Sequence, residues 1–139
     1  MRTIDTLTGM ETLDSQECLS LLGSKTIGRV AVVDGYSPVV FPVNYVLDGS
    51  GIVFRVAEGT KLHSVGRANA CFEVDEFDEE SRAGWSVLAV GRLEELTSLD
   101  PDFERVSRMP VHPWAEGHRP HLLRLVPSRV TGRRVGGGR

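Results

Sequence analysis

The sequence is poor in several features that define whole classes of protein. It has two cysteines in 139 residues; Cys18 and Cys71 both lie in apolar surroundings, so we expect two buried free thiols in a reducing compartment rather than a disulfide. Aromatic residues make up only 6% of the chain, too few for the stacking surface that single-stranded nucleic acid needs. No apolar run approaches the roughly 20 residues of a membrane-spanning helix, and residues 1–15 lack the apolar segment of a secretory signal. These absences favour a cytoplasmic protein that binds neither nucleic acid nor a membrane.

What the chain does contain is the composition of an ordinary globular protein, with 40% hydrophobic and 25% charged residues. A chain of this length buries roughly 68% of its unfolded surface. The net charge of −3 is unevenly spread, because acidic residues crowd positions 73–80 whereas six arginines and no acid follow Glu116. A basic end of this kind can reach a phosphate or the acidic surface of a partner subunit. We expect one domain over residues 1–134, with 1–12 as a loose arm and 135–139 as a disordered tail.

Hydrophobic periodicity predicts strands interrupted by brief helices. A helix over 15–22 is framed by the capping pattern of Asp14 and Glu17 and by Gly23. Strands are expected over 27–33, 39–47, 52–57, 71–77, 85–96 and 122–133, with an interruption at Pro127, and a second short helix over 100–108. Hairpin connections between so many strands indicate a mainly β fold, a split antiparallel β-barrel with short peripheral helices.

Two of these strands are apolar on both faces, over residues 39–47 and 87–90. In a closed barrel one face of each strand fills the interior and the other meets water, which produces an alternating pattern. Two small helices cannot cover the whole outer face. We therefore expect a second copy of the chain to cover it, in a homodimer.

The sequence pattern predicts that the stretch from Phe54 to Leu62 changes from a strand into a helix. Gly59 supplies a turn, Thr60 can cap the helix, and Lys61 lies in its first turn. A lysine adds nothing to the stability of a helix N-terminus, which already carries partial positive charge, but it suits a bound anion such as a phosphate. Glu58 argues mildly against this, since its carboxylate must point away. The alternative is a capped surface helix with a solvated lysine.

Other reactive residues form no recognisable site. The four histidines are His63, His112, His118 and His121. Their spacing is irregular and no cysteine or carboxylate completes a metal site, so we expect no metal. Histidines of the loop near a cleft could instead donate protons to a substrate or ligate haem. The chain has no Ser/His/Asp spacing and no Cys-x-x-Cys, and no catalytic residue is assigned.

The order of the motifs resembles the pyridoxamine 5′-phosphate oxidase-like split β-barrel superfamily, closest to its small bacterial branch that includes the nitroimidazole-resistance proteins. The resemblance extends over about residues 12–134. The matching segments are GRVA at 28–31, PVVFPVNY at 38–45, FR at 54–55 with GTKL at 59–62, WSV at 85–87 with GR at 91–92, and LRLVP at 123–127 ending in TGR at 131–133.

The resemblance implies a homodimer with two flavin sites in the clefts between subunits, usually occupied by FMN. Phosphate binding would fall to Arg55, Thr60 and Lys61, and backbone groups of Val43 and Asn44 would line the isoalloxazine. The full set of implied cofactor-binding residues is Val43, Asn44, Arg55, Val56, Thr60, Lys61, Trp85 and Ser86.

Alternatives stay open for several of these residues. Asn44 could be a strand asparagine satisfied by neighbouring backbone, and Trp85 could belong to the core or to an interface. Arg124 and Arg133 could reach the other subunit's site or lie exposed on the surface.

The resemblance implies an FMN-dependent oxidoreductase acting on a small organic substrate. A reductase that uses the deazaflavin F420 is one alternative, and a non-enzymatic flavin- or haem-binding protein is another. The 38–45 strand has no basic residue for the second phosphate of pyridoxamine phosphate, which argues against vitamin B6 synthesis.

Overall fold

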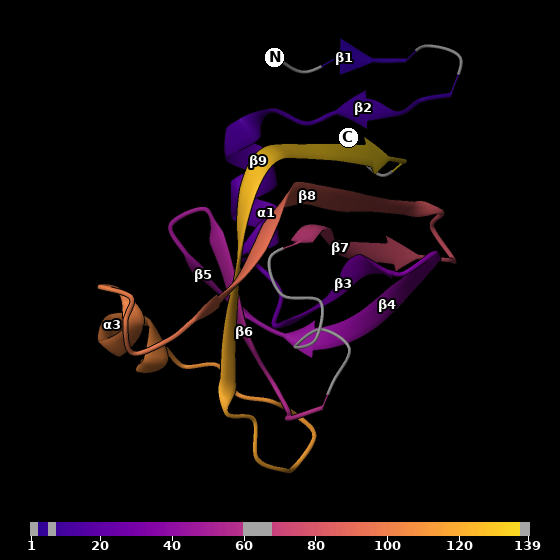
Figure 1. The fold of residues 1–139 in the computed structure, drawn as a ribbon. Coiled ribbons are helices and arrows are strands. Elements are labelled where there is room, and N and C mark those ends of the chain that lie inside the picture. Colours follow the sequence, from indigo (N-terminus) through magenta and orange to yellow (C-terminus); the bar gives the residue numbers. More distant parts are fainter. Residues whose placement is uncertain (1–2, 6–7, 60–67, 137–139) are drawn as a thin grey trace.

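The computed structural model describes residues 3–5, 8–59 and 68–136. Its strands form one curled antiparallel sheet with two short helices at its margins (Figure 1), which confirms the mainly β architecture. The strands are β1 (Thr3–Ile4), β2 (Glu11–Thr12), β3 (Ile27–Asp34), β4 (Ser37–Asn44), β5 (Val46–Asp48), β6 (Gly51–Val56), β7 (Ala68–Asp78), β8 (Ala83–Leu96) and β9 (His121–Val135). The helices are α1 (Ser15–Leu22) and α3 (Phe103–Ser107).

The sheet runs in the order β1-β2-β9-β8-β7-β3-β4, and β6 joins it through β9. The long strand β9 pairs with β6 through residues 121–125 and with β2 through residues 133 and 134. Its register against β8 shifts between Val90 and Gly91, opposite Pro127. This β-bulge is the interruption predicted at the proline, and it bends β9 so that its two halves complete different parts of the sheet. A Cβ at Gly91 would lie 2.0 Å from the Val126 carbonyl oxygen, so the close approach requires glycine.

The concave face of the sheet encloses the main core. Phe72 is fully buried at its centre and packs edge-on against Tyr45, with ring centroids 4.7 Å apart. A Cβ at Gly28 would lie 2.2 Å from the Phe72 ring, so the glycine makes room for it. Helix α1 closes one end of the core with Cys18 and Leu22. A smaller cluster lies beneath α3 and contains Val53, Leu96, Val106 and Leu122.

Helix α1 matches its prediction because its signals are local. The Asp14 carboxylate accepts a hydrogen bond from the backbone N–H of Glu17 at 2.8 Å, and Gly23 caps the C-terminus. The predicted strand over 39–47 is instead two strands. It breaks at Tyr45, whose ring turns into the core and whose hydroxyl donates to the Leu22 carbonyl.

The structure corrects the expectations for the N-terminal arm, for Cys71 and for the second helix. In the described part of the N-terminal arm, β1 and β2 form a hairpin that extends the sheet along β9, so this part is not loose (Figure 1). Cys18 is buried as expected, but Cys71 is only half-buried, and both thiols are free. The helix expected over 100–108 is shorter, as α3. The helix expected after Gly59 and residues 137–139 of the expected tail lie outside the described residues.

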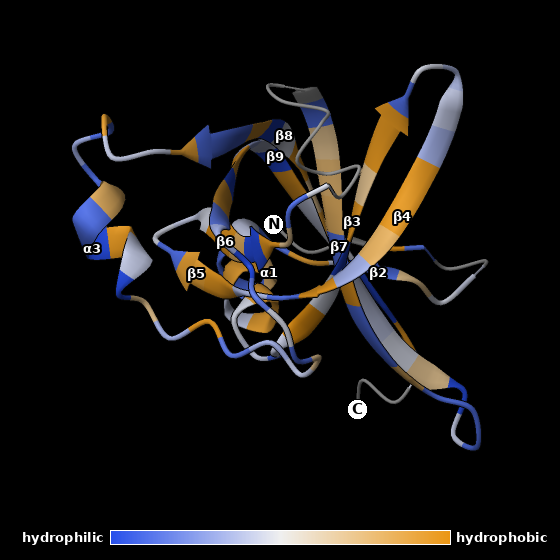
Figure 2. Cartoon of the chain, turned by 60° about the horizontal axis from the view of Figure 1, so that its bottom comes forward, coloured by the Kyte–Doolittle hydropathy of each residue, from blue (hydrophilic) through white to orange (hydrophobic). Residues whose placement is uncertain are grey.

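The convex face of the sheet carries a continuous apolar row. Strand pairing aligns Val40, Ala31, Cys71 and Val90 across β4, β3, β7 and β8, on the face opposite the buried Phe72, since successive side chains alternate. Val40 is 61% exposed, and Figure 2 shows the apolar character of the edge strand β4. Among the described residues, no helix is long and apolar enough to span a membrane.

Candidate functional site

A pocket of about 200 Å³ lies between β4, the end of β6 and the loop 109–120 that joins α3 to β9. We call it the β4–β6 pocket. It is lined by Phe41, Pro42, Val43, Asn44, Arg55, Val56, Ala57, Pro113, Ala115 and Arg119. Its walls are largely apolar, and among the described residues its two charged side chains are both arginines.

The two arginines of this pocket are held by backbone carbonyls. Nη2 of Arg55 donates to the carbonyl of Ser107, the last residue of α3, at 2.9 Å. Nη1 of Arg119 donates to carbonyls of Ala115 and Gly117 at 2.9 and 3.1 Å. Among the described residues, no carboxylate forms an ion pair with either guanidinium. The pocket therefore holds positive charge that the fold does not neutralise, which favours an anionic ligand.

The side chain of Asn44 connects the loop 109–120 to strand β4 through a hydrogen bond. Its Nδ2 donates to the Thr26 carbonyl at 3.2 Å, and its Oδ1 accepts from the backbone N–H of Trp114 at 2.9 Å. The amide is thus satisfied by backbone groups, which is the alternative expected for a strand asparagine. By fixing the loop, Asn44 also fixes the wall of the pocket that carries Arg119.

A histidine lies between two carboxylates directly beside the pocket. His121, the first residue of β9, pairs with the pocket residue Val56. Its Nδ1 lies 2.7 Å from a carboxylate oxygen of Glu95, and its Nε2 lies 3.1 Å from one of Glu58. The hydrogen bond with Glu95, together with Glu58, raises the pKa of His121. The imidazole is therefore biased toward its charged form, in which both nitrogens donate.

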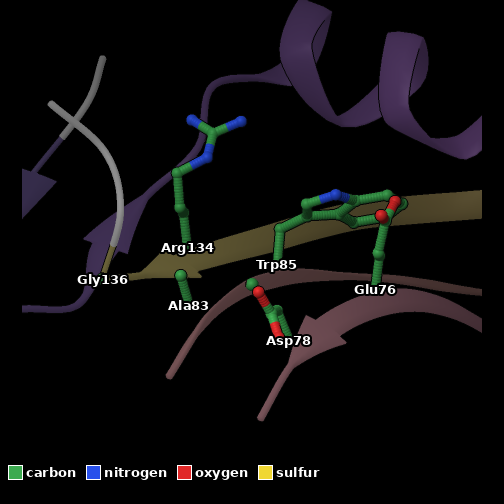
Figure 3. Close-up of a pocket in the computed structure, with 7 residues that line it drawn as sticks. Glu76, Asp78, Ala83, Trp85, Arg134 and Gly136 are labelled. Atoms are coloured by element: carbon green, nitrogen blue, oxygen red, sulfur yellow. The ribbon is translucent and has the colours of Figure 1, made fainter. Parts of the chain in front are cut away.

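A second pocket of about 230 Å³ lies at the far end of β7 and β8 (Figure 3). Trp85 lies across it, with Glu76 to one side and Arg134 to the other. The Arg134 guanidinium is directed toward the N-terminal segment, where it lies 3.5 Å from Glu17 and 3.9 Å from Glu11. Carboxylates line this pocket, so it lacks the unbalanced positive charge of the β4–β6 pocket.

The half-buried Arg124 of β9 belongs to an ion network rather than to either pocket. Arg124 is 17% exposed and contacts Glu94 at 3.0 Å, Asp102 at 3.2 Å and Asp48 at 3.3 Å. Arg105 of α3 adds a two-pronged contact with Asp48, at 2.8 and 3.1 Å. The network ties the β5–β6 hairpin, α3 and β9 together. Arg124 is thus neither exposed nor directed outward.

Four of the eight predicted cofactor-binding residues lie together in the β4–β6 pocket. Val43, Asn44, Arg55 and Val56 line one pocket. Thr60 and Lys61 lie outside the described residues. Trp85 lies in the second pocket and Ser86 follows it in β8, so within one chain neither lines the β4–β6 pocket.

Sequence reasoning missed the contribution of the loop. Arg119 lines the pocket with Arg55 although 64 positions separate them, and no motif of the loop predicts this. The basic C-terminal part of the chain is the one available signal. Among the residues that the structure describes, no group of three or more His, Cys, Asp or Glu side chains could hold a metal ion.

Comparisons with known proteins identify the family and the fold. The family model described as pyridoxamine 5′-phosphate oxidase matches residues 14–134. An uncharacterised protein of Mycobacterium tuberculosis is 30% identical over 130 residues, which are 88% of this chain and 84% of that protein. The FAD-binding protein from Mycobacterium smegmatis is 33% identical, with a TM-score of 0.75 over 90% of this chain and 97% of its own.

More distant structures share the fold. A candidate 5-nitroimidazole antibiotic resistance protein from Bacteroides thetaiotaomicron is 15% identical, with a TM-score of 0.66 over 91% of this chain and 89% of its own. An FAD- and haem-binding protein from Mycobacterium smegmatis is 16% identical, with a TM-score of 0.62 over 91% of this chain and 74% of its own. At these identities the likeness concerns the fold alone.

Proposed function

The chain belongs to the pyridoxamine 5′-phosphate oxidase family, and from this premise we propose that it binds a flavin whose phosphate lies in the β4–β6 pocket. The observation that carries the proposal is the pair Arg55 and Arg119, which line one pocket that has no carboxylate among its described lining residues. The FAD-binding neighbour at 33% identity supports a flavin.

The residues of the pocket fit the two ends of such a ligand. Guanidinium groups bind phosphate through charge-assisted hydrogen bonds. Arg55 uses one of its five N–H donors in the hydrogen bond to the Ser107 carbonyl, which leaves the others for a ligand. The apolar side chains of Phe41, Pro42 and Val43 suit one face of an isoalloxazine ring. A bound flavin supplies hydride or electron transfer, while the protein places it and excludes water. Under this proposal Asn44 keeps the loop wall closed over that ring.

We further propose that the working unit is a homodimer. A pocket of about 200 Å³ is smaller than the roughly 300–1,000 Å³ typical of cofactor sites, so one chain supplies part of the site. The apolar row that includes Val40 and Val90 offers a face for a second copy. Trp85 and Ser86, remote from the pocket of their own chain, are available to the site of a partner. Sedimentation equilibrium at micromolar concentration should give twice the chain mass, and a monomer would contradict the dimer.

The cofactor that we propose is FMN, in an oxidoreductase that acts on a small organic molecule. FAD contains the same riboflavin phosphate, so it satisfies the same pocket and must be separated by experiment. The edge strand β4, with the sequence SPVVFPVN, has no basic side chain, and we do not propose pyridoxamine phosphate as substrate.

Spectroscopy of the purified protein tests the proposal. Titration with FMN, FAD, F420 or haem should give tight binding of FMN or FAD, seen as quenched flavin fluorescence. Lys61→Ala should weaken FMN by about tenfold or more and leave riboflavin, which lacks the phosphate, little changed. A Soret band with haem and no flavin binding would replace the proposal with a haem protein. Binding of F420 alone would replace it with a deazaflavin reductase.

A further inference from the structure

The residue that follows the pocket lining of β6 in the sequence is a glutamate. Glu58 follows Val56 and Ala57, which both line the pocket. A carboxylate in this position repels an anionic ligand unless its charge is neutralised or held away. The same residue argues against an anion site at the level of sequence.

His121 holds that carboxylate. The Glu58 side chain is 77% exposed, yet a carboxylate oxygen lies 3.1 Å from Nε2 of the imidazole, which is itself 16% exposed. Strand pairing places His121 directly opposite Val56, so β6 and β9 fix the spacing between histidine and pocket.

Glu95 fixes the orientation of the imidazole. Its carboxylate lies 2.7 Å from Nδ1, on the side of the ring away from Nε2. With Nδ1 bound to Glu95 of β8 in this way, Nε2 lies within ion-pair distance of Glu58, at 3.1 Å, without the alignment of a hydrogen bond to it. When both nitrogens carry protons, one imidazolium serves both carboxylates.

We propose that His121 is a positioning residue of the β4–β6 pocket, which neutralises Glu58 and holds its carboxylate out of the phosphate site. The inference rests on the proposed flavin function. It assigns to Glu95 the task of orienting the ring. It also predicts that the protein loses affinity for phosphate-bearing flavins when the imidazolium loses its proton.

The test measures dissociation constants for FMN and riboflavin by flavin fluorescence in the full-length protein. His121→Gln should weaken FMN by about three- to fivefold, the range expected for one partly exposed ion pair, and riboflavin by less than about twofold. Glu58→Gln alone should leave FMN affinity unchanged or slightly higher. The double variant His121→Gln/Glu58→Gln should regain the FMN affinity of Glu58→Gln.

A matched control separates this contact from the general charge of the region. Glu116 is an exposed carboxylate on the loop that lines the pocket. Glu116→Gln removes the same charge as Glu58→Gln. Combined with His121→Gln, it should not restore FMN binding.

The pH dependence of FMN affinity is a second test of the proposal, and it requires no substitution at His121. Among the described residues, the charged groups paired with the imidazole are Glu58, after β6, and Glu95 of β8, while Arg119 two residues earlier bonds carbonyls of its own loop. Between about pH 7 and pH 9 a phosphate keeps two negative charges. FMN affinity of the wild type should fall several-fold across this range, and that of Glu58→Gln should fall less.

The outcomes distinguish failure of the role proposed for His121 from failure of the proposed flavin function. Equal weakening of FMN and riboflavin by His121→Gln, no rescue by Glu58→Gln, or equal rescue by Glu116→Gln would overturn the inference and leave the flavin function intact. A wild-type protein that binds neither flavin overturns the proposed function and this inference with it. If His121→Gln does not fold, the pH profiles of the wild type and Glu58→Gln decide, because identical profiles contradict the proposal.

Discussion

Two regions of this protein are built around arginines, and they use them in opposite ways. Around Arg124 the fold gathers Asp48, Asp102 and Glu94 within 3.3 Å, so positive and negative charges are matched inside the structure. Around the β4–β6 pocket, Arg55 and Arg119 bond backbone carbonyls only, among the described residues. In the first region the charge of the arginine is neutralised by carboxylates, whereas in the second the charges of the guanidinium groups remain available to an anionic ligand.

The difference shows that residue type alone does not assign a role. A guanidinium with carboxylate partners resists removal because it leaves unpaired charges behind. A guanidinium held by carbonyls is positioned but not neutralised. The two regions are nevertheless connected, because α3 carries Arg105 of the network and ends at Ser107, the partner of Arg55. Substitutions in each region test whether stability and binding separate in this way.

The largest effect is expected from Arg124→Met. Removal of this half-buried cation leaves the carboxylates of Asp48, Asp102 and Glu94 close together, and we expect the free energy of unfolding to fall by about 2 kcal/mol, less than for a fully buried pair because solvent reaches the partners. Urea unfolding followed by circular dichroism measures it. Arg133→Met, at an exposed position of the same strand, should change stability by no more than about 0.5 kcal/mol. Equal effects at the two positions would show that the network does not stabilise the fold.

Arg55→Met should have the reverse profile. We expect FMN affinity to drop by about 10- to 100-fold, because a charge-assisted hydrogen bond contributes about 1.5–3 kcal/mol. Stability should change by less than about 1 kcal/mol, since the substitution removes a single hydrogen bond to a carbonyl. Fluorescence titration and urea unfolding of the same preparation give both values. A loss of stability without a loss of FMN affinity would place Arg55 among the structural arginines.

A smaller effect is expected in acid, through Asp48. Its hydrogen bond to Arg105, with further help from Arg124, holds the pKa of the carboxyl below its ordinary value. A carboxyl of this kind stabilises the folded state above its unfolded pKa, and the contribution is lost as the pH falls through the folded pKa. Between about pH 5 and pH 2, the unfolding free energy of Asp48→Asn should therefore decline less than that of the wild type. Parallel declines would mean that Asp48 gains nothing from its arginines.

The smallest effect is expected from Arg105→Ala. Its side chain is 57% exposed, and solvent screens ion pairs of this kind. The urea midpoint should fall only slightly, because Asp48 loses its two-pronged contact with Arg105 but keeps Arg124 as a partner. FMN affinity should also be retained, because Ser107 keeps its carbonyl. A large loss of affinity would show that α3 transmits strain from the network to Arg55.

Sequence reasoning recovers the features whose signals are local. The cap at Asp14, the end of α1 at Gly23 and the period of most strands all depend on neighbours a few residues apart. Of the ten described residues that line the β4–β6 pocket, the prediction named four, Val43, Asn44, Arg55 and Val56, which lie in the motifs of β4 and β6. The break at Tyr45 escapes such reasoning, since nothing local shows that its ring enters the core.

What the sequence by itself determined is the set of strands, the turns between them and the cation Arg55 beside an apolar strand, because alternation, capping and turn chemistry act over short distances. Only the tertiary structure decided which charges meet. The bulge at Gly91 and the register of β9 bring Arg124 to three acids, His121 to Glu58, and the loop with Arg119 to Arg55. These partners lie tens of residues apart, and strand pairing over such separations is fixed by the packing of the whole sheet rather than by any segment of the chain.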